Sequence, residues 1–329
     1  MDTLHDFQSS SRALWRSLSS EAGARGATPE YDELAQVPWA VVAWTTLAYF
    51  VALKLFGWLV ANPVASLAFG AVSRKGDAKT AARKAKFVSA ACEMAVYSSS
   101  FVVGSVLLWR QPWVWPTSEW WRGGPQARVE KGMGFFYVAY AARYVAMLVL
   151  VLTSPRKKDF HEMILHHVVT AALVLLSYTA GLIRAGLVIM VLFDVADPFL
   201  HAAKTINYLK ESAPTGTATQ GALSTVTDAL FGMFALSLFL TRIVLFTYVT
   251  LSVFYEAVIE SSPTGDYFEG LELTDVSLFV CQALTLTLYV LQWFWFALLV
   301  DLIRRTLRGE DLKDNRSDDE GVQESKKSD

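Results

Sequence analysis

The stretch that decides the fold is RKKDFHEMILHHVVTAALVLLSYTAGLIRAGLVIMVLFDVADPFLHAAK, residues 156–204. Three basic residues open it, an apolar helix with a double histidine follows, and a second apolar helix contains two aspartates. Four of the five histidines of the chain lie here, namely His161, His166, His167 and His201. An ionisable side chain in hydrocarbon costs about 3 kcal/mol or more. Such residues are therefore expected to pair, to line a wet cavity or to do chemistry.

The composition of the whole chain is that of a multi-pass membrane protein. Of its 329 residues, 53% are hydrophobic and 18% are charged, and the mean hydropathy is +0.33. These values are too apolar for an ordinary soluble domain. The formal net charge of −2 provides no basic field for nucleic acid. Cys92 and Cys281 lie in apolar runs, without the spacing of a disulfide framework or a metal site.

Seven apolar segments are each close to the roughly 20 residues that a bilayer-spanning helix needs. They lie at residues 39–61, 87–109, 134–153, 161–178, 183–203, 223–254 and 276–303. We therefore predict an all-α, polytopic membrane protein with about seven transmembrane helices. Its parts are a polar N-terminal tail at 1–37, a first transmembrane helix with a basic cytosolic loop at 38–80, a six-helix domain at 81–308 and an acidic tail at 309–329.

Lys and Arg in the connecting segments predict the orientation of the chain in the membrane. The segments after the first, third and seventh spans are basic, and a seven-span arrangement places all three on one side. The other side has a loop at 255–275 without Lys or Arg. It also has tryptophans that suit the membrane interface, namely Trp109, Trp113, Trp115, Trp120 and Trp121. We therefore expect a cytosolic C-terminus and an N-terminus across the membrane.

The polar residues of the fourth and fifth spans are expected at one depth. His166 lies about 10 Å from the basic end of the fourth span, and Asp194 and Asp197 lie about 10–15 Å from the same end of the fifth. On one continuous helix the two aspartates share a stripe with His201. Because neighbouring spans are antiparallel, the two clusters are predicted to meet.

Histidine close to a carboxylate is typical of acid–base and acyl-transfer sites. A neutral histidine accepts a proton near neutral pH, and a carboxylate orients it. An imidazole can also take up an acyl group covalently. We therefore select His166, His167, Asp194 and Asp197 as catalytic candidates. A single metal ion on these residues is the alternative, whereas the histidine boxes of membrane di-iron hydroxylases need more histidines than this chain has.

Other polar residues have structural as well as functional interpretations. The basic run Arg156, Lys157 and Lys158 is a topology signal, and it equally suits the phosphates of a CoA thioester. Glu162 lies four residues before His166 and shares its helix face. Ionisable groups in other spans are interpreted as structural ion pairs between helices, namely Glu93, Arg143 and Arg242.

RKKDFHEMILHHVVTAALVLLSY and RAGLVIMVLFDVADPFLHAAKTINY resemble the Lag1 motif of ceramide synthases, within the TRAM–Lag–CLN8 (TLC) domain family. The resemblance covers about residues 60–308 and includes KFVSAACEMAVY at 86–97 and FLTRIVLF at 239–246. The double histidine together with Asp-x-x-Asp resembles the ceramide synthase branch specifically.

The resemblance implies a barrel of six helices around a lipid cavity, with the first span outside. It implies an enzyme of the endoplasmic reticulum membrane that N-acylates a sphingoid base, such as sphinganine, with a fatty acyl-CoA to give (dihydro)ceramide. No cofactor or metal is implied, because acyl-CoA as co-substrate is already activated. Expected partners are these two substrates and membrane lipids, and no nucleic acid. The resemblance is also compatible with a homodimer or a heterodimer. The candidate substrate-binding residues are Arg156, Lys157, Lys158, Glu162, Ser177, Arg184 and His201.

Some positions depart from the family pattern. Many members have His where Phe193 stands, Asn where Gly181 stands and Glu where His201 stands. These differences bear on substrate preference rather than on reaction type. The end of the chain, with Lys326 and Lys327, resembles a dilysine retrieval signal of the endoplasmic reticulum. The alternative function is a non-enzymatic TLC-domain lipid sensor, cargo receptor or chaperone, which would not need the histidine and aspartate pairs.

Overall fold

The computed structural model describes residues 31–33, 39–72, 78–109, 111–122, 128–154, 156, 159–257 and 272–308. Most of these residues are helical. Two strands of three residues each, β1 (Tyr31–Glu33) and β2 (Arg128–Glu130), pair in antiparallel fashion. The prediction of an all-α protein is therefore confirmed.

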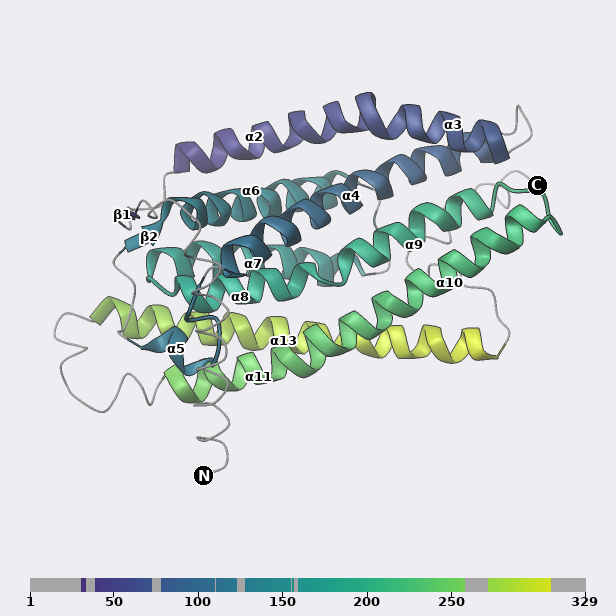
Figure 1. The fold of residues 1–329 in the computed structure, drawn as a ribbon. Coiled ribbons are helices and arrows are strands. Elements are labelled where there is room, and N and C mark those ends of the chain that lie inside the picture. The colour runs from purple at the N-terminus through teal and green to yellow at the C-terminus, as the bar shows by residue number, and fades with distance from the viewer. Residues whose placement is uncertain are drawn as a thin grey trace, which may run out of the picture.

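Long helical rods carry the chain back and forth along one axis (Figure 1). They are α2 (Trp39–Phe56) with η1 (Gly57–Ala61) and α3 (Asn62–Val72); α4 (Ala78–Trp109); α6 (Lys131–Thr153); α7 (Phe160–Thr179); α10 (Ala218–Leu238) with η2 (Phe239–Leu245), α11 (Phe246–Leu251) and η3 (Ser252–Glu256); and α13 (Glu272–Leu307). The three η elements are π-helical. Within the described residues, six helices are long and apolar enough to cross a membrane. The chain is a multi-pass membrane protein.

The remaining crossing consists of two shorter helices, α8 (Ile183–Asp194) and α9 (Asp197–Lys210), which together run along the bundle (Figure 1). The expectation of one continuous helix over 183–203 was wrong, because the helix breaks at Val195 and Ala196. Pro198 lies in the first turn of α9. It has no amide hydrogen for the carbonyl of Asp194, and its ring crowds the preceding turn. The two aspartates therefore lie on either side of a break.

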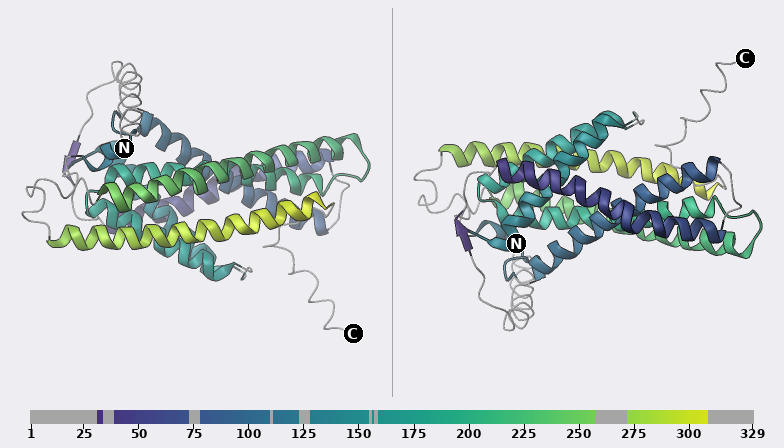
Figure 2. Two further views of the ribbon diagram at one scale, coloured as in Figure 1. Left: turned by 90° about the horizontal axis from the view of Figure 1, so that it is seen from below. Right: turned by 90° about the horizontal axis from the view of Figure 1, so that it is seen from above.

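Six of the crossings form a closed ring. Around it, α6 packs on α7, α7 on α13, α13 on α11 and η2, α10 on α9, α8 and α9 on α4, and α4 on α6. The rod from α2 to α3 lies outside this ring, along α6 and α4 (Figures 1 and 2). This arrangement confirms the predicted six-helix barrel with the first span outside.

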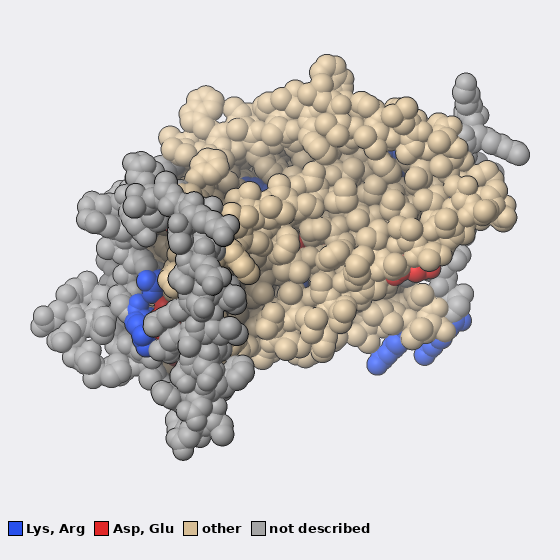
Figure 3. Space-filling model, in the orientation of Figure 1, with Lys and Arg blue, Asp and Glu red and all other residues tan. Residues whose placement is uncertain are grey.

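The surface of the bundle is consistent with a lipid environment. In the face that Figure 3 shows, few charged atoms lie between the two ends of the molecule. α4 and α13 have 32 and 36 residues, so they are about 48 and 54 Å long, whereas the hydrocarbon layer is about 30 Å thick. These helices therefore extend beyond the bilayer.

A glycine-dependent turn joins α7 to α8 and sets how their inner faces meet. Gly181 has a φ of 70°, a left-handed conformation that glycine adopts without steric cost. The amide of Leu182 donates to the carbonyl of Ser177 at 2.8 Å, and the amide of Gly181 donates to that of Tyr178 at 3.2 Å. This is the Schellman pattern of a helix C-terminus. A short helix at the same end of the bundle, α5 (Ser118–Trp121), covers the ring.

Candidate active site

Both members of the double histidine are buried on α7 and lie against one aromatic ring. The ring centroids of His166 and His167 are 5.4 Å apart. Each lies close to Tyr144 of α6, with centroid distances of 5.7 and 5.6 Å. Adjacent helical residues are turned about 100° apart, and the tyrosine ring fills the angle between them. Tyr144 was not selected from the sequence, although its spacing of four from Tyr140 on an apolar helix was a signal for a shared inner face.

His166 faces the junction of α6, α7 and α13. The hydroxyl oxygen of Thr170 lies 3.5 Å from its Nδ1 atom. The ring of Trp295 on α13 meets the imidazole edge to face, with centroids 5.2 Å apart. Thr170 lies four residues after His166 and therefore shares one face of α7 with it.

Asp194 is held by an arginine from α6. The guanidinium of Arg143 donates two hydrogen bonds to its carboxylate, at 3.1 and 2.8 Å. The hydroxyl of Tyr140 lies 3.3 Å from the same carboxylate and shares its one hydrogen between it and the carbonyl of Met190. Both charged side chains are buried, with exposures of 4% for Arg143 and 1% for Asp194. The guanidinium also lies over the rings of Tyr97, Tyr140 and Tyr144, at 5.0, 4.1 and 5.2 Å. The ion pair therefore sits inside an aromatic cage.

Asp197 is held by a second arginine, Arg242, which lies in the π-helical turn η2. Arg242 also donates to the carbonyl of Phe193. That carbonyl lies in the last turn of α8, where backbone carbonyls have no amide donor within the helix. Arg242 therefore joins the two sides of the helix break. π-Helical turns are rare in proteins, and those that occur are often found at functional sites.

These pairings differ from the contact expected between an aspartate and a histidine. Asp194 does lie close to the depth of the histidines. Its partner Arg143 lies over the ring of Tyr144, and that ring contacts both His166 and His167. Among the contacts of the described residues, however, the two carboxylates pair with arginines and with the hydroxyls of Tyr140 and Ser100, and with no imidazole. The interpretation of Arg143 and Arg242 as ion pairs between spans fits this geometry. The same described residues contain no group of three His, Cys, Asp or Glu arranged to hold a metal ion.

His201 lies on α9 and forms a third polar link. Its Nδ1 atom is 2.9 Å from a carboxylate oxygen of Glu93 on α4. Its ring stacks on Tyr97, with centroids 5.2 Å apart and planes within 7° of parallel. The side chain of Glu93 is 46% exposed. A carboxylate therefore reaches the outside of the ring at the seam between α4 and α9.

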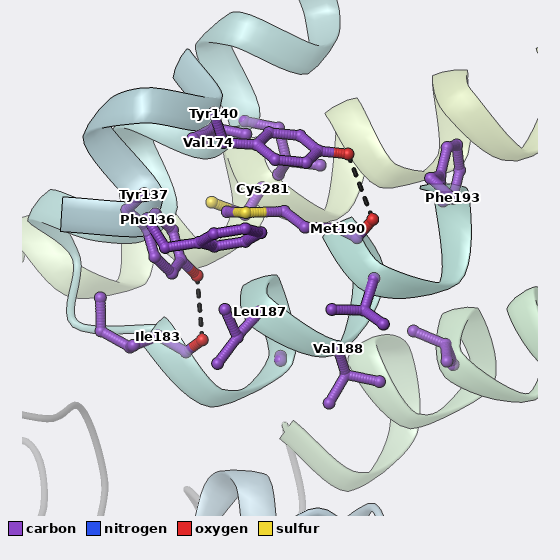
Figure 4. Packing of buried hydrophobic residues seen from close by; sticks show 14 of the residues in the cluster. Phe136, Tyr137, Tyr140, Val174, Ile183, Leu187, Val188, Met190, Phe193 and Cys281 are labelled. Carbon is purple, nitrogen blue, oxygen red and sulfur yellow. Dashed lines mark hydrogen bonds between the residues drawn. The ribbon is translucent and has the colours of Figure 1, made fainter. Parts of the chain in front are cut away.

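An apolar cavity begins beside Thr170 and extends away from the histidines. It holds about 580 Å³ of empty space, counting its open mouth, between side chains of α6, α7, α8, η3 and α13. Tyr140 lines the cavity, and its hydroxyl donates to the carbonyl of Met190 at 3.2 Å; Tyr137, on the same helix, donates to the carbonyl of Ile183 at 2.9 Å (Figure 4). These bonds hold α6 against α8 beside the cavity.

The far end of the cavity is covered by the tryptophan-rich segment. Trp121 of α5 lines the cavity, and its indole nitrogen donates to the hydroxyl of Ser252 at 2.9 Å. Trp120 is buried and donates to the carbonyl of Val114 at 3.0 Å. The segment predicted to sit at the membrane interface therefore also closes the space inside the ring.

The candidate substrate-binding residues are spread along the bundle. Ser177 lines the cavity, with its hydroxyl donating to the carbonyl of Val174 at 3.1 Å. Glu162 is half-buried in the first turn of α7. Arg184, at the opposite end of the ring, donates to the carbonyls of Glu119 and Arg122 at 2.9 and 3.0 Å.

Arg156 is exposed close to the start of α7, with its guanidinium 5.2 Å from the centre of the Phe160 ring. The other predicted basic residues of this run, Lys157 and Lys158, lie outside the described residues. So do most of the acidic loop at 255–275 and the end of the chain with its dilysine-like pair.

The fold and the site together define a class: a multi-pass helical membrane protein with a buried histidine pair, two arginine–aspartate pairs and an adjoining apolar cavity. The family model of the TLC domain (TRAM_LAG1_CLN8) matches residues 86–301. The chain belongs to the TLC-domain family.

Relatives of known name share this region. Ceramide synthase 4 of Mus musculus is 30% identical over 71% of this chain and 54% of its own length. Ceramide synthase 4 of Bos taurus is 29% identical over 73% of this chain and 56% of its own length. ASC1-like protein 3 of Oryza sativa subsp. japonica is 27% identical over 84% of this chain and 94% of its own length. The chain thus spans about half the length of the ceramide synthases that it matches.

Proposed function

We propose that this protein is a ceramide synthase, which transfers a fatty acyl group from acyl-CoA to the amine of a sphingoid base such as sphinganine. One observation carries the proposal: the buried imidazole of His166 lies beside an apolar cavity. Its Nδ1 atom is 3.5 Å from the hydroxyl of Thr170, and Thr170 lines that cavity. The names of the matched ceramide synthases support the choice of reaction.

The acyl chain occupies the cavity. Along α13 the cavity is lined from Leu278 to Leu288, a distance of about 15 Å at 1.5 Å per residue. An extended hydrocarbon chain advances about 1.25 Å per carbon, because its bonds of about 1.5 Å zigzag about the chain axis, so roughly a dozen methylene groups fill that length. The lining is almost wholly apolar, which suits burial of hydrocarbon.

The polar end of the thioester then lies beside His166. Two routes are compatible with this placement. In the first, His166 accepts a proton from the sphingoid amine as that amine attacks the thioester carbonyl. In the second, the imidazole attacks first, CoA thiolate leaves, and the amine then takes the acyl group from the acyl-imidazole. In both, the C–S bond breaks, a C–N bond forms, and the thiolate takes up the proton that the amine loses. No cofactor is required by either route.

The CoA moiety lies toward the basic end of the bundle. Arg156, with Lys157 and Lys158 next to it in the sequence, supplies cations for its phosphates. We assign this end to the cytosol, because Lys and Arg concentrate in cytosolic segments. The C-terminus is then cytosolic and the N-terminus is lumenal, in the endoplasmic reticulum membrane.

The sphingoid ammonium is assigned to the seam between α4 and α9. Asp194 and Asp197 are already paired with arginines, so neither is the natural partner of a further cation. Glu93 is half-exposed there and lies 2.9 Å from His201. An amine held by this carboxylate approaches the histidines from the outer side of the ring.

The test is N-acylation of sphinganine by the purified protein with a panel of acyl-CoA chain lengths. His166→Ala and His167→Ala are compared with wild type, and His161→Ala serves as a matched control, because His161 is exposed on the same helix. We expect product from wild type and His161→Ala, and loss of product in the other two variants with folding retained. Acyl-CoA alone should add one acyl mass to wild type, and not to His166→Ala, if the covalent route operates.

No product with any acyl-CoA, under conditions in which mouse ceramide synthase 4 works, would refute the enzyme assignment. The alternative is then a non-enzymatic lipid sensor, cargo receptor or chaperone. Equal activity of His166→Ala and wild type would show that the double histidine is not the reacting centre.

A further inference from the structure

Two buried hydrogen-bond donors of α13 lie beside the candidate site without an acceptor. Within the part of the chain that the structure describes, Nε2 of Gln292 and Nε1 of Trp295 have no hydrogen-bond partner. Gln292 is only 1% exposed. An unpaired donor costs several kcal/mol in the membrane interior, where water cannot replace the missing partner. The fold therefore maintains two donors at a cost that its own stability does not explain.

The position of these donors on α13 is set by helical spacing. Thr285 and Leu288 line the cavity. Gln292 and Trp295 lie four and seven residues after Leu288, so they continue the same helix face beyond the cavity. This face leads from the apolar cavity to the level of the histidines.

The contact between Trp295 and His166 fixes the register of α13 against α7. Their ring centroids are 5.2 Å apart. Because α7 and α13 run in opposite directions (Figure 1), a residue three positions before Trp295 lies about 4.5 Å nearer the cavity. Gln292 is therefore level with Thr170, whose hydroxyl lies 3.5 Å from Nδ1 of His166. The two donors therefore lie just beyond the end of the cavity that Thr170 and Leu288 line.

An acyl chain that fills the cavity and reaches this end places its carbonyl beside the two donors. We propose that Nε2 of Gln292 and Nε1 of Trp295 form the oxyanion hole of the acyl transfer. The proposal rests on the acyltransferase function and adds two catalytic residues to it. It gives the unpaired donors an acceptor that exists only when substrate is bound.

The chemistry requires such donors. When nitrogen attacks the thioester, a C–N bond forms and the π electron pair of the carbonyl moves onto oxygen. The pair returns as the C–S bond breaks, and the thiolate leaves and takes up the proton that nitrogen loses. The negative oxygen of the intermediate needs hydrogen-bond donors that are already in place. A dry, apolar surrounding makes each donor more effective than it is in water.

The experiment removes each N–H group with little change of shape. Gln292→Met and Trp295→Phe are assayed as purified full-length proteins with sphinganine and the best acyl-CoA. Loss of one oxyanion-hole donor lowers kcat by about 10²–10³-fold. The expected result for Gln292→Met is a fall of this size, with the KM for acyl-CoA close to that of wild type. Trp295→Phe keeps an aromatic ring against His166 and should also lower kcat.

Thermal unfolding separates this role from a structural one. Because the removed donor has no partner in the folded protein, both variants should unfold at the wild-type temperature or above it. Trp293→Phe is the matched control, because Trp293 lies on the same helix with 45% exposure. It should keep the kcat of wild type.

Wild-type kcat in both Gln292→Met and Trp295→Phe would overturn the proposal while leaving the acyltransferase function intact. Loss of kcat together with a fall in the unfolding temperature would also overturn it, because the residues would then act through stability. A wild-type protein inactive with every acyl-CoA would refute the proposed function, and the oxyanion hole with it.

Discussion

Replacing Arg143 by methionine should destabilise the fold far more than replacing both Arg143 and Asp194. In the wild type, the carboxylate of Asp194 is 1% exposed and accepts two hydrogen bonds from Arg143. Arg143→Met leaves this carboxylate buried, with the hydroxyl of Tyr140 as the hydrogen-bond donor that remains on α6. Breaking a buried pair by removing one partner costs about 3–5 kcal/mol, most of it from the uncompensated charge.

The double variant Arg143→Met/Asp194→Asn removes that charge. The amide oxygen introduced by Asp194→Asn can still accept the hydrogen bond of Tyr140, and methionine retains the contact with the aromatic cage. Replacing both members of a buried ion pair by neutral groups is often close to neutral in stability. We therefore expect the double variant to recover about 2–3 kcal/mol of the loss, a coupling energy typical of residues in direct contact.

The assay is thermal unfolding of the purified protein at fixed detergent concentration, followed by tryptophan fluorescence. One kcal/mol corresponds to about 2–4 °C for chains of 150–250 residues and to less for longer ones. At about 2 °C per kcal/mol, the lower end of this range, the loss of about 3–5 kcal/mol in Arg143→Met should lower the midpoint by roughly 6–10 °C. Arg305→Met is the control, because Arg305 pairs with Asp301 at 2.9 Å and both side chains are partly exposed, at 31% and 61%; solvent-exposed pairs contribute about 1 kcal/mol at most.

Equal midpoints for Arg143→Met and the double variant would refute the reasoning, because the uncompensated charge would then contribute nothing. A loss in Arg305→Met as large as that in Arg143→Met would refute it as well, since burial would not be the deciding factor.

Two further variants test the cavity. Gly186→Ala places a Cβ atom 2.0 Å from the hydroxyl oxygen of Tyr137, so its unfolding free energy should fall by about 1–3 kcal/mol. In Gly232→Ala the new Cβ atom has nothing within 4 Å, so the unfolding free energy should stay unchanged or rise by up to about 1 kcal/mol. Equal losses of unfolding free energy in the two variants, measured by chemical denaturation, would contradict the clash. Cys281→Phe fills part of the cavity and should shift product toward shorter acyl chains in a mixed acyl-CoA competition read by mass spectrometry, whereas an unchanged product profile would place the acyl chain elsewhere.

The crossings were predictable because each depends on local properties of the sequence. Length and apolarity identify a spanning segment without reference to its neighbours. The same local logic contained the signal for the break that was missed. Asp197-Pro198 is typical of a helix start, since proline is favoured in the first turn, where amide hydrogens have no partner. The apolar run over 183–203 outweighed this signal, although a proline in a helix interior costs about 3 kcal/mol.

The partners of the aspartates were not predictable, because depth in the membrane does not determine rotation about a helix axis. Arg143 lies on α6 and Arg242 in η2, and both were predicted to form ion pairs between spans without a prediction of their partners. The π-helical turn that carries Arg242 turns the residues after it relative to a regular helix, and single-sequence periodicity assumes about 3.6 residues per turn throughout. Only the packed structure therefore shows that the partner of each carboxylate is a guanidinium and not an imidazole.

The packed ring divides into a polar layer and an apolar layer, and this division supports the proposed position of the acyl transfer. Three links cross the ring in the polar layer: Arg143 to Asp194, Arg242 to Asp197, and Glu93 to His201. They join α4, α6, η2, α8 and α9 around the helix break. The apolar cavity starts beside this layer, and its lining suits hydrocarbon and offers no charged group to a phosphate. A fatty acyl thioester is polar at one end and apolar at the other, so in the proposed reaction we expect its carbonyl where the two layers meet. The double histidine lies at that boundary, held against Tyr144 by helices that the ion pairs fix in place.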